Sequence, residues 1–265
     1  MAEQDILYEI EDGVGTITLN RPQSLNAITE EMLAALAEFL EESKRDPNVK
    51  VLVLTGAGRA FCAGANPRKL DMDKDEELLP FRDEESLLSW GQSLYWAFIN
   101  YDKPLLAAVN GPAAGGGMDL ATSCDIRIAS DKAKFRMAFV RMGVTPSGSS
   151  AYWLPRLVGL ANAYELIWTG KVIDAQEAYR IGYVNRVVPH DELMATTREL
   201  ALTLAKGPTV AIRLSKRLIR QCLNMDVFSA LGVIEAAEFI TENTEDAKEG
   251  PRAWVEKREP QFKGR

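Results

Sequence analysis

Two runs of apolar residues, each followed by a glycine-containing turn, constrain the fold most strongly. Val51-Leu52-Val53-Leu54 precedes Gly56 and Gly58, and Leu105–Val109 precedes Asn110-Gly111. A continuous apolar run of this length is typical of a strand that is buried on both faces. Because such strands alternate with helical patterns along the first two-thirds of the chain, the sequence predicts an α/β fold.

A hairpin and a capped helix are predicted near the start of the chain. Ile6–Ile10 and Val14–Leu19 are short β-rich segments, and Asp12-Gly13 between them indicates a hairpin. Thr29 can cap a helix over Glu30–Arg45, whose apolar residues fall on one face. Three further segments are a charged, mobile loop over Arg68–Glu85, a helix over Leu87–Tyr101 and a strand over Ile126–Ala129. Helical spacing favours a core position for three aromatic residues, Trp90, Tyr95 and Trp96.

The last third of the chain has a different character. After about Asp191 nearly every segment has a helical pattern. The predicted helices cover Asp191–Ala205, Thr209–Met225, Val227–Glu245 and Asp246–Glu256. We therefore divide the chain into an α/β core over residues 1–192 and a helical C-terminal region over residues 193–265.

Composition excludes several classes of protein. The formal net charge of −7 argues against nucleic-acid binding through a broad basic face. Cys62, Cys124 and Cys222 are odd in number and form no CxxC pair, so neither a disulfide framework nor a zinc site is expected. No apolar run approaches the roughly 20 residues that span a bilayer, and the acidic start does not resemble a signal peptide. We expect a cytoplasmic protein with no membrane or nucleic-acid partner.

Two familiar enzyme sites do not fit this sequence. Gly56-Ala57-Gly58 follows a strand, but Phe61 stands where a dinucleotide-binding fingerprint needs its third glycine. A serine hydrolase would need His190, the one histidine, which lies in an acidic segment typical of an exposed helix start. The phosphate-loop motif and the HExxH metal motif are absent from the sequence, and we expect no metal.

Two glycine-rich turns are the strongest indication of a site. One is Phe61-Cys62-Ala63-Gly64-Ala65-Asn66, and the other is Gly115-Gly116-Gly117-Met118-Asp119-Leu120 at a predicted helix start. Either turn by itself could simply supply a change of direction. Together they suggest a ligand, because small residues let it approach the backbone and a helix N-terminus presents free N–H groups. Two such groups aimed at one carbonyl oxygen form an oxyanion hole.

These turns and several other segments resemble the enoyl-CoA hydratase/isomerase (crotonase) superfamily, in the family's order and over nearly the whole chain. The segments are Asn20-Arg21-Pro22, Leu25-Asn26-Ala27, Val53-Leu54-Thr55-Gly56, Phe61-Cys62-Ala63-Gly64-Ala65, Lys103-Pro104, Ala107-Ala108-Val109-Asn110-Gly111, Gly115–Asp119, Cys124-Asp125-Ile126 and Trp254-Val255-Glu256-Lys257-Arg258. The resemblance implies a crotonase-like spiral of ββα units with a helical C-terminal trimerisation region, giving a homotrimer or a dimer of trimers.

The resemblance also implies an acyl-CoA thioester substrate and places the residues that would hold it. The family's oxyanion amides match the N–H groups of Ala65 and Gly116. The positions that line the nucleotide end of coenzyme A match Gln23, Ser24, Leu25 and Ala63. Trp254 and Lys257 match positions that close over the ligand, often from a neighbouring subunit, although Lys257 could equally be a solvated helix charge. No cofactor is implied, because coenzyme A is part of the substrate.

The acids of this chain depart from the family pattern. The first hydratase glutamate matches Asp119, the second falls at Phe139, and the acid of many enoyl-CoA isomerases falls at Ser147. Asp119 could also be an ordinary helix-start carboxylate. With one acid, we predict an isomerase in which Asp119 moves a proton and Phe139 and Ser147 adjoin the acyl pocket. The alternatives are a hydratase in which Asp119 activates water, and an acyl-CoA binder without catalysis.

Overall fold

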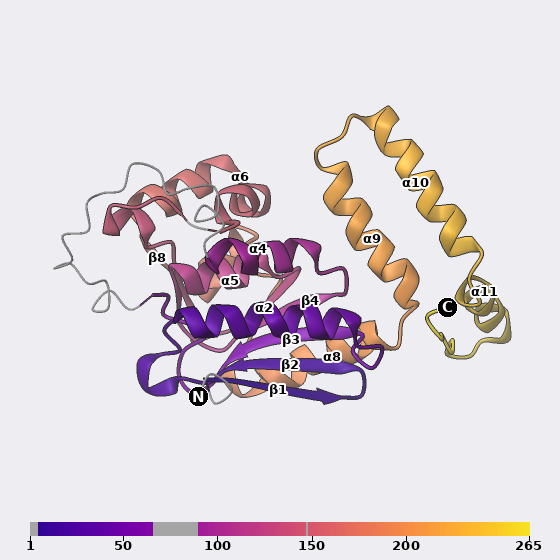
Figure 1. Cartoon of the computed structure of the whole chain (residues 1–265), viewed down its shortest axis with the longest axis horizontal. Helices are drawn as coiled ribbons and strands as arrows, with labels where there is room; N and C mark the ends of the chain where they lie inside the picture. The colour runs from indigo at the N-terminus through magenta and orange to yellow at the C-terminus, as the bar shows by residue number, and fades with distance from the viewer. Residues whose placement is uncertain (1–4, 66–89, 147) are drawn as a thin grey trace.

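A six-stranded sheet forms the centre of the computed structural model, which describes residues 5–65, 90–146 and 148–265 (Figure 1). Its strands are, in spatial order, β1 (Ile6–Glu11), β2 (Val14–Leu19), β3 (Val51–Gly56), β4 (Leu105–Val109), β6 (Ile126–Ser130) and β9 (Arg186–Val188). β1 and β2 form the predicted antiparallel hairpin, and the other neighbouring pairs are parallel. The two apolar runs therefore lie side by side as β3 and β4.

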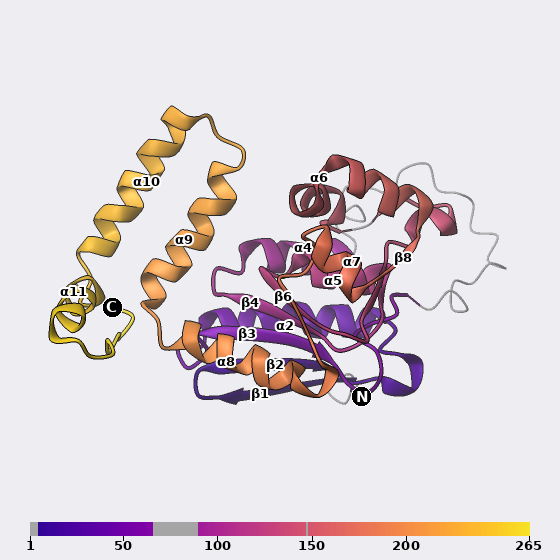
Figure 2. The same cartoon turned by 180° about the vertical axis from the view of Figure 1, so that it is seen from behind.

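Helices cover both faces of this sheet. α2 (Glu30–Arg45) and α4 (Trp90–Asn100) lie on one face, and α8 (Leu193–Ala205) crosses the other (Figures 1 and 2). Successive β3 side chains alternate between the two layers, as the pleat of a strand requires. Leu52 and Leu54 enter the core under α2 and α4, while Val51 and Val53 pack in a second core with residues of α8. Burial on both faces explains why the strand is apolar at every position.

A smaller sheet and three helices extend this body. The three-stranded sheet has the order β5 (Ala113–Ala114), β7 (Lys134–Arg136) and β8 (Val172–Asp174). The helices around it are α5 (Gly116–Ser123), α6 (Ser150–Thr169) and α7 (Ala175–Arg180). Three 3-10 turns complete the described elements, η1 (Pro22–Ser24), η3 (Phe139–Met142) and η4 (His190–Glu192). α6 contains Pro155 and is kinked at Gly159, whose φ of 77° is not helical.

The last three helices form a C-terminal arm, defined here as residues 209–265. α9 (Thr209–Cys222) and α10 (Val227–Glu242) run beside each other, and α11 (Asp246–Glu256) lies at the far end (Figures 1 and 2). Asp125 anchors α9 to the body, because its carboxylate accepts from Lys216 Nζ at 2.6 Å and from Arg220 at 3.0 Å. The rest of the arm projects away from the sheet.

The predicted α/β fold with a helical C-terminal region is confirmed, with local differences. Trp96 is 56% exposed, so the expectation that it lies in the core is wrong, whereas the Tyr95 ring packs against the core. The Trp90 side chain and the predicted loop Arg68–Glu85 lie outside what the structure describes. Among the described residues, no helix combines the length and the apolar character that crossing a bilayer would need.

Candidate active site

The two glycine-rich turns predicted from the sequence touch each other. Cys62 and Ala113 form a parallel bridge, and the Ala114 N–H donates to the Cys62 carbonyl at 3.0 Å. Gly64 has a φ of +81°, and a Cβ there would lie 2.5 Å from the Ala114 oxygen and 3.2 Å from the Gly116 nitrogen. A residue without a Cβ is therefore required at the point of contact.

The backbone N–H groups of Ala65 and Gly116 lie on either side of this contact. Ala65 follows Gly64 directly, and Gly116 is the first residue of α5. Within residues 5–65, 90–146 and 148–265, neither N–H donates to a protein acceptor. Ala65 is exposed and Gly116 is partly exposed, so both amides are open to a ligand. The two N–H groups can both donate hydrogen bonds to one negatively polarised oxygen.

Asp119 lies one turn further along α5 and is fully buried. Its Oδ2 accepts a hydrogen bond from the Tyr95 hydroxyl at 2.8 Å. Its Oδ1 accepts from the Ser150 N–H at 3.0 Å and from the Ser150 hydroxyl. The Asp119 carboxylate therefore joins three helices, α4, α5 and α6.

Opposing influences set the acidity of Asp119. Burial removes water from the carboxylate, disfavours its charged form and raises its pKa from 3.8 to about 6. The three hydrogen bonds from Ser150 and Tyr95 stabilise the charged form and limit the rise. A carboxyl group with this pKa can both remove and return a proton near neutral pH.

A second set of hydrogen bonds fastens the backbone around Asp119. The Ser123 hydroxyl donates to the Asp119 carbonyl at 3.0 Å and lies 2.8 Å from the Ser149 hydroxyl. Ser149 precedes the first residue of α6, so this chain of hydroxyls holds the start of α6 against α5. The contact fixes Ser150 opposite the carboxylate.

Sequence reasoning missed Tyr95 and Ser150 as parts of the site. Tyr95 is assigned to the core by its helical spacing, and its ring does pack there, but its hydroxyl reaches Asp119. Ser150 lies 31 residues from Asp119, on a helix that the sequence does not predict. A polar serine pair at the start of an apolar helix is the signal that could have pointed to it.

The other two positions where the family places an acid are occupied by Phe139 and Ser147. Phe139 is half-buried at the start of η3 and packs against the core. It follows Ala138, whose Cβ is 4.0 Å from the place that a Cβ on Gly115 would take, so Phe139 lies near the second glycine-rich turn. Ser147 lies outside the described residues.

His190 is half-buried in η4, with Nδ1 at 3.1 Å from the Ser130 hydroxyl, and belongs to the opposite part of the sheet.

Four residues assigned to coenzyme A by the resemblance gather beside the first turn. Gln23 and Ser24 end the short η1 turn, with Gln23 exposed, and Leu25 follows. The Ala63 N–H donates to the Leu25 carbonyl at 2.9 Å, which places Leu25 next to Ala63. The structure thus brings these residues together with the Ala65 and Gly116 amides.

A buried amide side chain holds this arrangement in place. Asn26 Nδ2 donates to the carbonyls of Ala57, Ala60 and Phe61 at 3.0, 2.8 and 3.1 Å. Its Oδ1 accepts from the Arg21 N–H at 2.8 Å. Asn26 therefore ties the η1 segment to the turn that follows β3.

Trp254 and Lys257 are not part of this cluster within one chain. α11 carries Trp254, and Lys257 caps its end, at the tip of the C-terminal arm and away from α5 (Figures 1 and 2). Trp254 is 85% exposed. Within one chain, these two residues therefore lie away from the glycine-rich turns.

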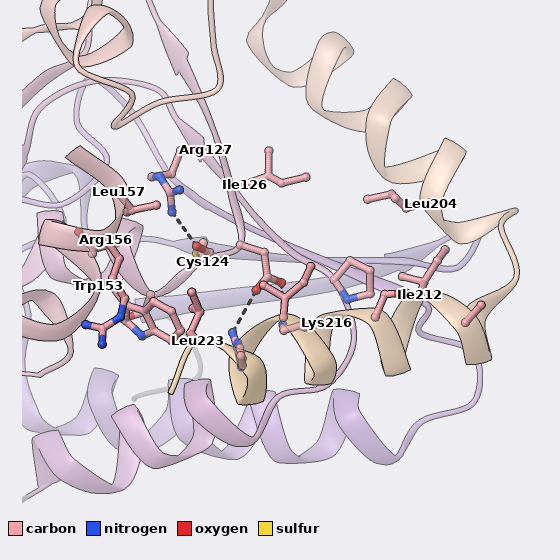
Figure 3. Close-up of a pocket in the computed structure, with 18 residues that line it drawn as sticks. Cys124, Ile126, Arg127, Trp153, Arg156, Leu157, Leu204, Ile212, Lys216 and Leu223 are labelled. Carbon is pink, nitrogen blue, oxygen red and sulfur yellow. Dashed lines mark hydrogen bonds and ion pairs between the residues drawn. The ribbon is translucent and has the colours of Figure 1, made fainter. Parts of the chain in front are cut away.

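A cavity also lies away from the glycine-rich turns. A hollow of about 610 Å³ separates α9 from the body, with Trp153 and Leu157 of α6 near one end and Leu204 and Ile212 near the other (Figure 3). Three of its charged groups form ion pairs, since Asp125 accepts from both Lys216 and Arg220. It adjoins the end of α5 that is remote from the glycine-rich turn.

Comparison with known proteins gives a consistent result. The sequence profile of the enoyl-CoA hydratase/isomerase family matches residues 9–265. The chain is 38% identical to the short-chain-enoyl-CoA hydratase of Clostridium acetobutylicum, over 100% of both chains. It is 37% identical to the 1,2-epoxyphenylacetyl-CoA isomerase of Escherichia coli, over 98% of both chains. A crystal structure of enoyl-CoA hydratase subunit I from Geobacillus kaustophilus superposes with a TM-score of 0.90 at 36% identity, covering 98% of both chains.

Proposed function

Because the chain belongs to the enoyl-CoA hydratase/isomerase family, we propose that it moves a double bond along the acyl chain of an enoyl-CoA thioester. The observation that supports this proposal is the buried carboxylate of Asp119, which lies one helical turn beyond Gly116 on α5. Its pKa of about 6 suits a group that must take up and release the same proton.

The proposed reaction needs the amides and one carboxylate. The N–H groups of Ala65 and Gly116 bind the thioester oxygen and polarise the carbonyl. Ionised Asp119 removes a proton from the acyl chain, and the electron pair moves onto the thioester oxygen as a dienolate. Protonated Asp119 then returns the proton to a different carbon, so that the double bond changes position and the carboxylate is regenerated.

The position of Phe139 favours an isomerase over a two-carboxylate hydratase. Phe139 stands where the hydratases of the family place their second acid, and it packs against the core. Among the family's acid positions that the structure describes, Asp119 is the one carboxylate that could hold such a water molecule. We propose that Phe139 and Ser147 adjoin the acyl chain, and that Gln23, Ser24, Leu25 and Ala63 contact the nucleotide end of coenzyme A.

Isotopes from solvent separate the possible reactions. The purified protein is given a 3-enoyl-CoA or a 2-enoyl-CoA in water labelled with deuterium or ¹⁸O, and the products are examined by mass spectrometry. We expect interconversion of the two substrates with no ¹⁸O in the product, and with deuterium in the acyl chain only to the extent that the proton on Asp119 exchanges with water before its return. Faster formation of an ¹⁸O-labelled 3-hydroxyacyl-CoA would make the protein a hydratase. Tight binding of every thioester without turnover would make it a binder.

We also propose that the C-terminal arm joins copies of the chain into a trimer, in which Trp254 and Lys257 of one copy approach the coenzyme of another. Support comes from the arm's large exposed apolar residues, such as Phe228 at 82% and Trp254 at 85%. Large apolar side chains left exposed along one part of a chain are typical of a protein–protein contact. Closed cyclic symmetry would let every copy use the same surface.

Light scattering after size exclusion should give a mass of about three 29.3 kDa protomers, or six if trimers pair. Replacing Phe228 and Phe239 of α10 with aspartate should shift the protein toward the monomer, because both are exposed apolar side chains that an interface would have to bury. Glu238→Gln on the same helix is the matched control and should leave the mass unchanged. A monomeric wild-type protein, or a double variant with unchanged mass, would contradict the proposal.

A further inference from the structure

We propose that Tyr95 and Ser150 are positioning residues that hold the Asp119 carboxylate in one orientation and direct the transferred proton to its Oδ2 atom. The inference rests on the proposed catalytic role of Asp119. It assigns roles to two side chains on helices that both contact α5, α4 and α6.

The hydrogen-bond count at Asp119 identifies the reactive oxygen. An ionised carboxylate has about four lone-pair sites, two on each oxygen. Oδ1 accepts from both the N–H and the hydroxyl of Ser150, so its two sites are filled. Oδ2 accepts from the Tyr95 hydroxyl, and among the described residues it has no second donor. One lone pair of Oδ2 therefore remains to receive a proton.

Packing fixes the two donors. Gly148 has a φ of +66°, and a Cβ at this position would overlap the Tyr95 ring, so the ring lies directly against the Gly148 backbone. The Phe98 ring is 6.4 Å from the Tyr95 ring on the same helix. Ser150 is the first residue of α6, whose start is held to α5 through Ser149. Neither donor can turn away without disturbing a packed helix.

The charge of Asp119 is balanced by these donors rather than by a cation. The titratable groups that face α5 near Asp119 are Tyr95 from α4, Tyr183, which bonds to Thr122 and the Met118 carbonyl, and Cys62 behind Gly117. Arg127 faces the other end of α5, where it donates to the Ala121 and Cys124 carbonyls. Among the described residues, no lysine, arginine or histidine forms an ion pair with Asp119. Loss of one neutral donor should therefore disfavour the ionised carboxylate and raise its pKa further.

Infrared spectroscopy of the unliganded protein tests the inference directly. The carbonyl band of the protonated Asp119 carboxyl group, isolated by subtracting the spectrum of Asp119→Asn, is followed as pH changes. We expect a midpoint near pH 6 for the wild-type protein. In Tyr95→Phe and in Ser150→Ala the midpoint should rise by roughly one pH unit, since each variant loses a hydrogen bond to a charged group. The rise of kcat/KM with pH should move by the same amount.

Matched variants separate positioning from general loosening of the fold. Tyr101→Phe removes another buried tyrosine hydroxyl, which bonds to Ser43, and should leave the midpoint unchanged. Ser150→Thr keeps a hydroxyl and should restore the wild-type midpoint. Unchanged midpoints in both Tyr95→Phe and Ser150→Ala, or an equal shift in Tyr101→Phe, would overturn the positioning role. Full activity of Asp119→Asn would instead overturn the proposed function, so the two failures are distinguishable.

Discussion

Replacing Asp119 with asparagine should lower kcat/KM for double-bond movement by about 10³-fold, within the range found when a general acid/base is removed. The amide has nearly the shape of the carboxylate but cannot take up the proton. Asp174→Asn is the matched control, because Asp174 caps α7 through Glu177 N at 2.8 Å and an asparagine oxygen can make the same bond. Unimpaired turnover by Asp119→Asn would contradict a single-carboxylate mechanism.

The same variant should be more stable than the wild-type protein at neutral pH. The folded-state pKa of Asp119, about 6, lies above the ordinary value of 3.8, so the folded protein binds more protons between these pH values. Stability should therefore fall as pH rises from about 4 to 6, by roughly 3 kcal/mol in total at 1.36 kcal/mol per pKa unit. Asp119→Asn lacks this pH-dependent loss of stability, because asparagine does not ionise. Urea unfolding at pH 5 and pH 7.5, at one protein concentration, should show a stability gain that is larger at pH 7.5.

Gly64→Ala should have the second largest effect, lowering kcat/KM by about 10²-fold, as the loss of one oxyanion donor does. The new Cβ would lie 2.5 Å from the Ala114 oxygen and 3.2 Å from the Gly116 nitrogen. The two turns must therefore move apart, and the Ala65 and Gly116 amides can no longer meet one oxygen. The left-handed backbone of Gly64 adds a strain of about 1–2 kcal/mol, which thermal unfolding should detect.

Gly143→Ala is the control that separates the steric clash with the Ala114 oxygen from the backbone strain of a positive φ. Gly143 also has a positive φ, of +75°, but a Cβ there would meet nothing within 4 Å. This variant should lose a similar amount of stability to strain and retain its activity. Equal losses of activity in the two variants, or a fully active Gly64→Ala, would argue against the paired amides as the oxyanion site.

The parts of the fold that were predictable are those with a signal in neighbouring residues. The predicted bounds of β4 (Leu105–Val109) and α2 (Glu30–Arg45) agree with the structure at both ends. The apolar run of β4 stops at Asn110, and Thr29 caps α2 by accepting from the Met32 N–H. No local pattern predicts α6, because Pro155 and the kink at Gly159 interrupt its helical period.

The same distinction applies to the site. Glycine spacing predicts that the two turns serve one ligand, and the structure places Gly64 against Gly116. The surroundings of Asp119 were not predictable, since Tyr95 and Ser150 lie 24 and 31 residues away on other helices. A tyrosine at helical spacing looks the same in sequence whether its hydroxyl meets water or a buried carboxylate. Only the packing of α4, α5 and α6 decides which.

The hydrogen bonds of Asn26 couple the two ends of the proposed ligand site, so that a displacement of one end is passed to the other. Its side-chain oxygen accepts from the Arg21 N–H, in the segment that leads to Leu25. Its side-chain nitrogen donates to the carbonyls of Ala60 and Phe61, a few residues before Ala65. A coenzyme that displaces the segment around Leu25 must also displace the segment before Ala65, because the hydrogen bonds that link them are buried and short. Binding of the distant nucleotide can thus help to position the thioester oxygen, so that remote contacts contribute to the reaction rate as well as to affinity.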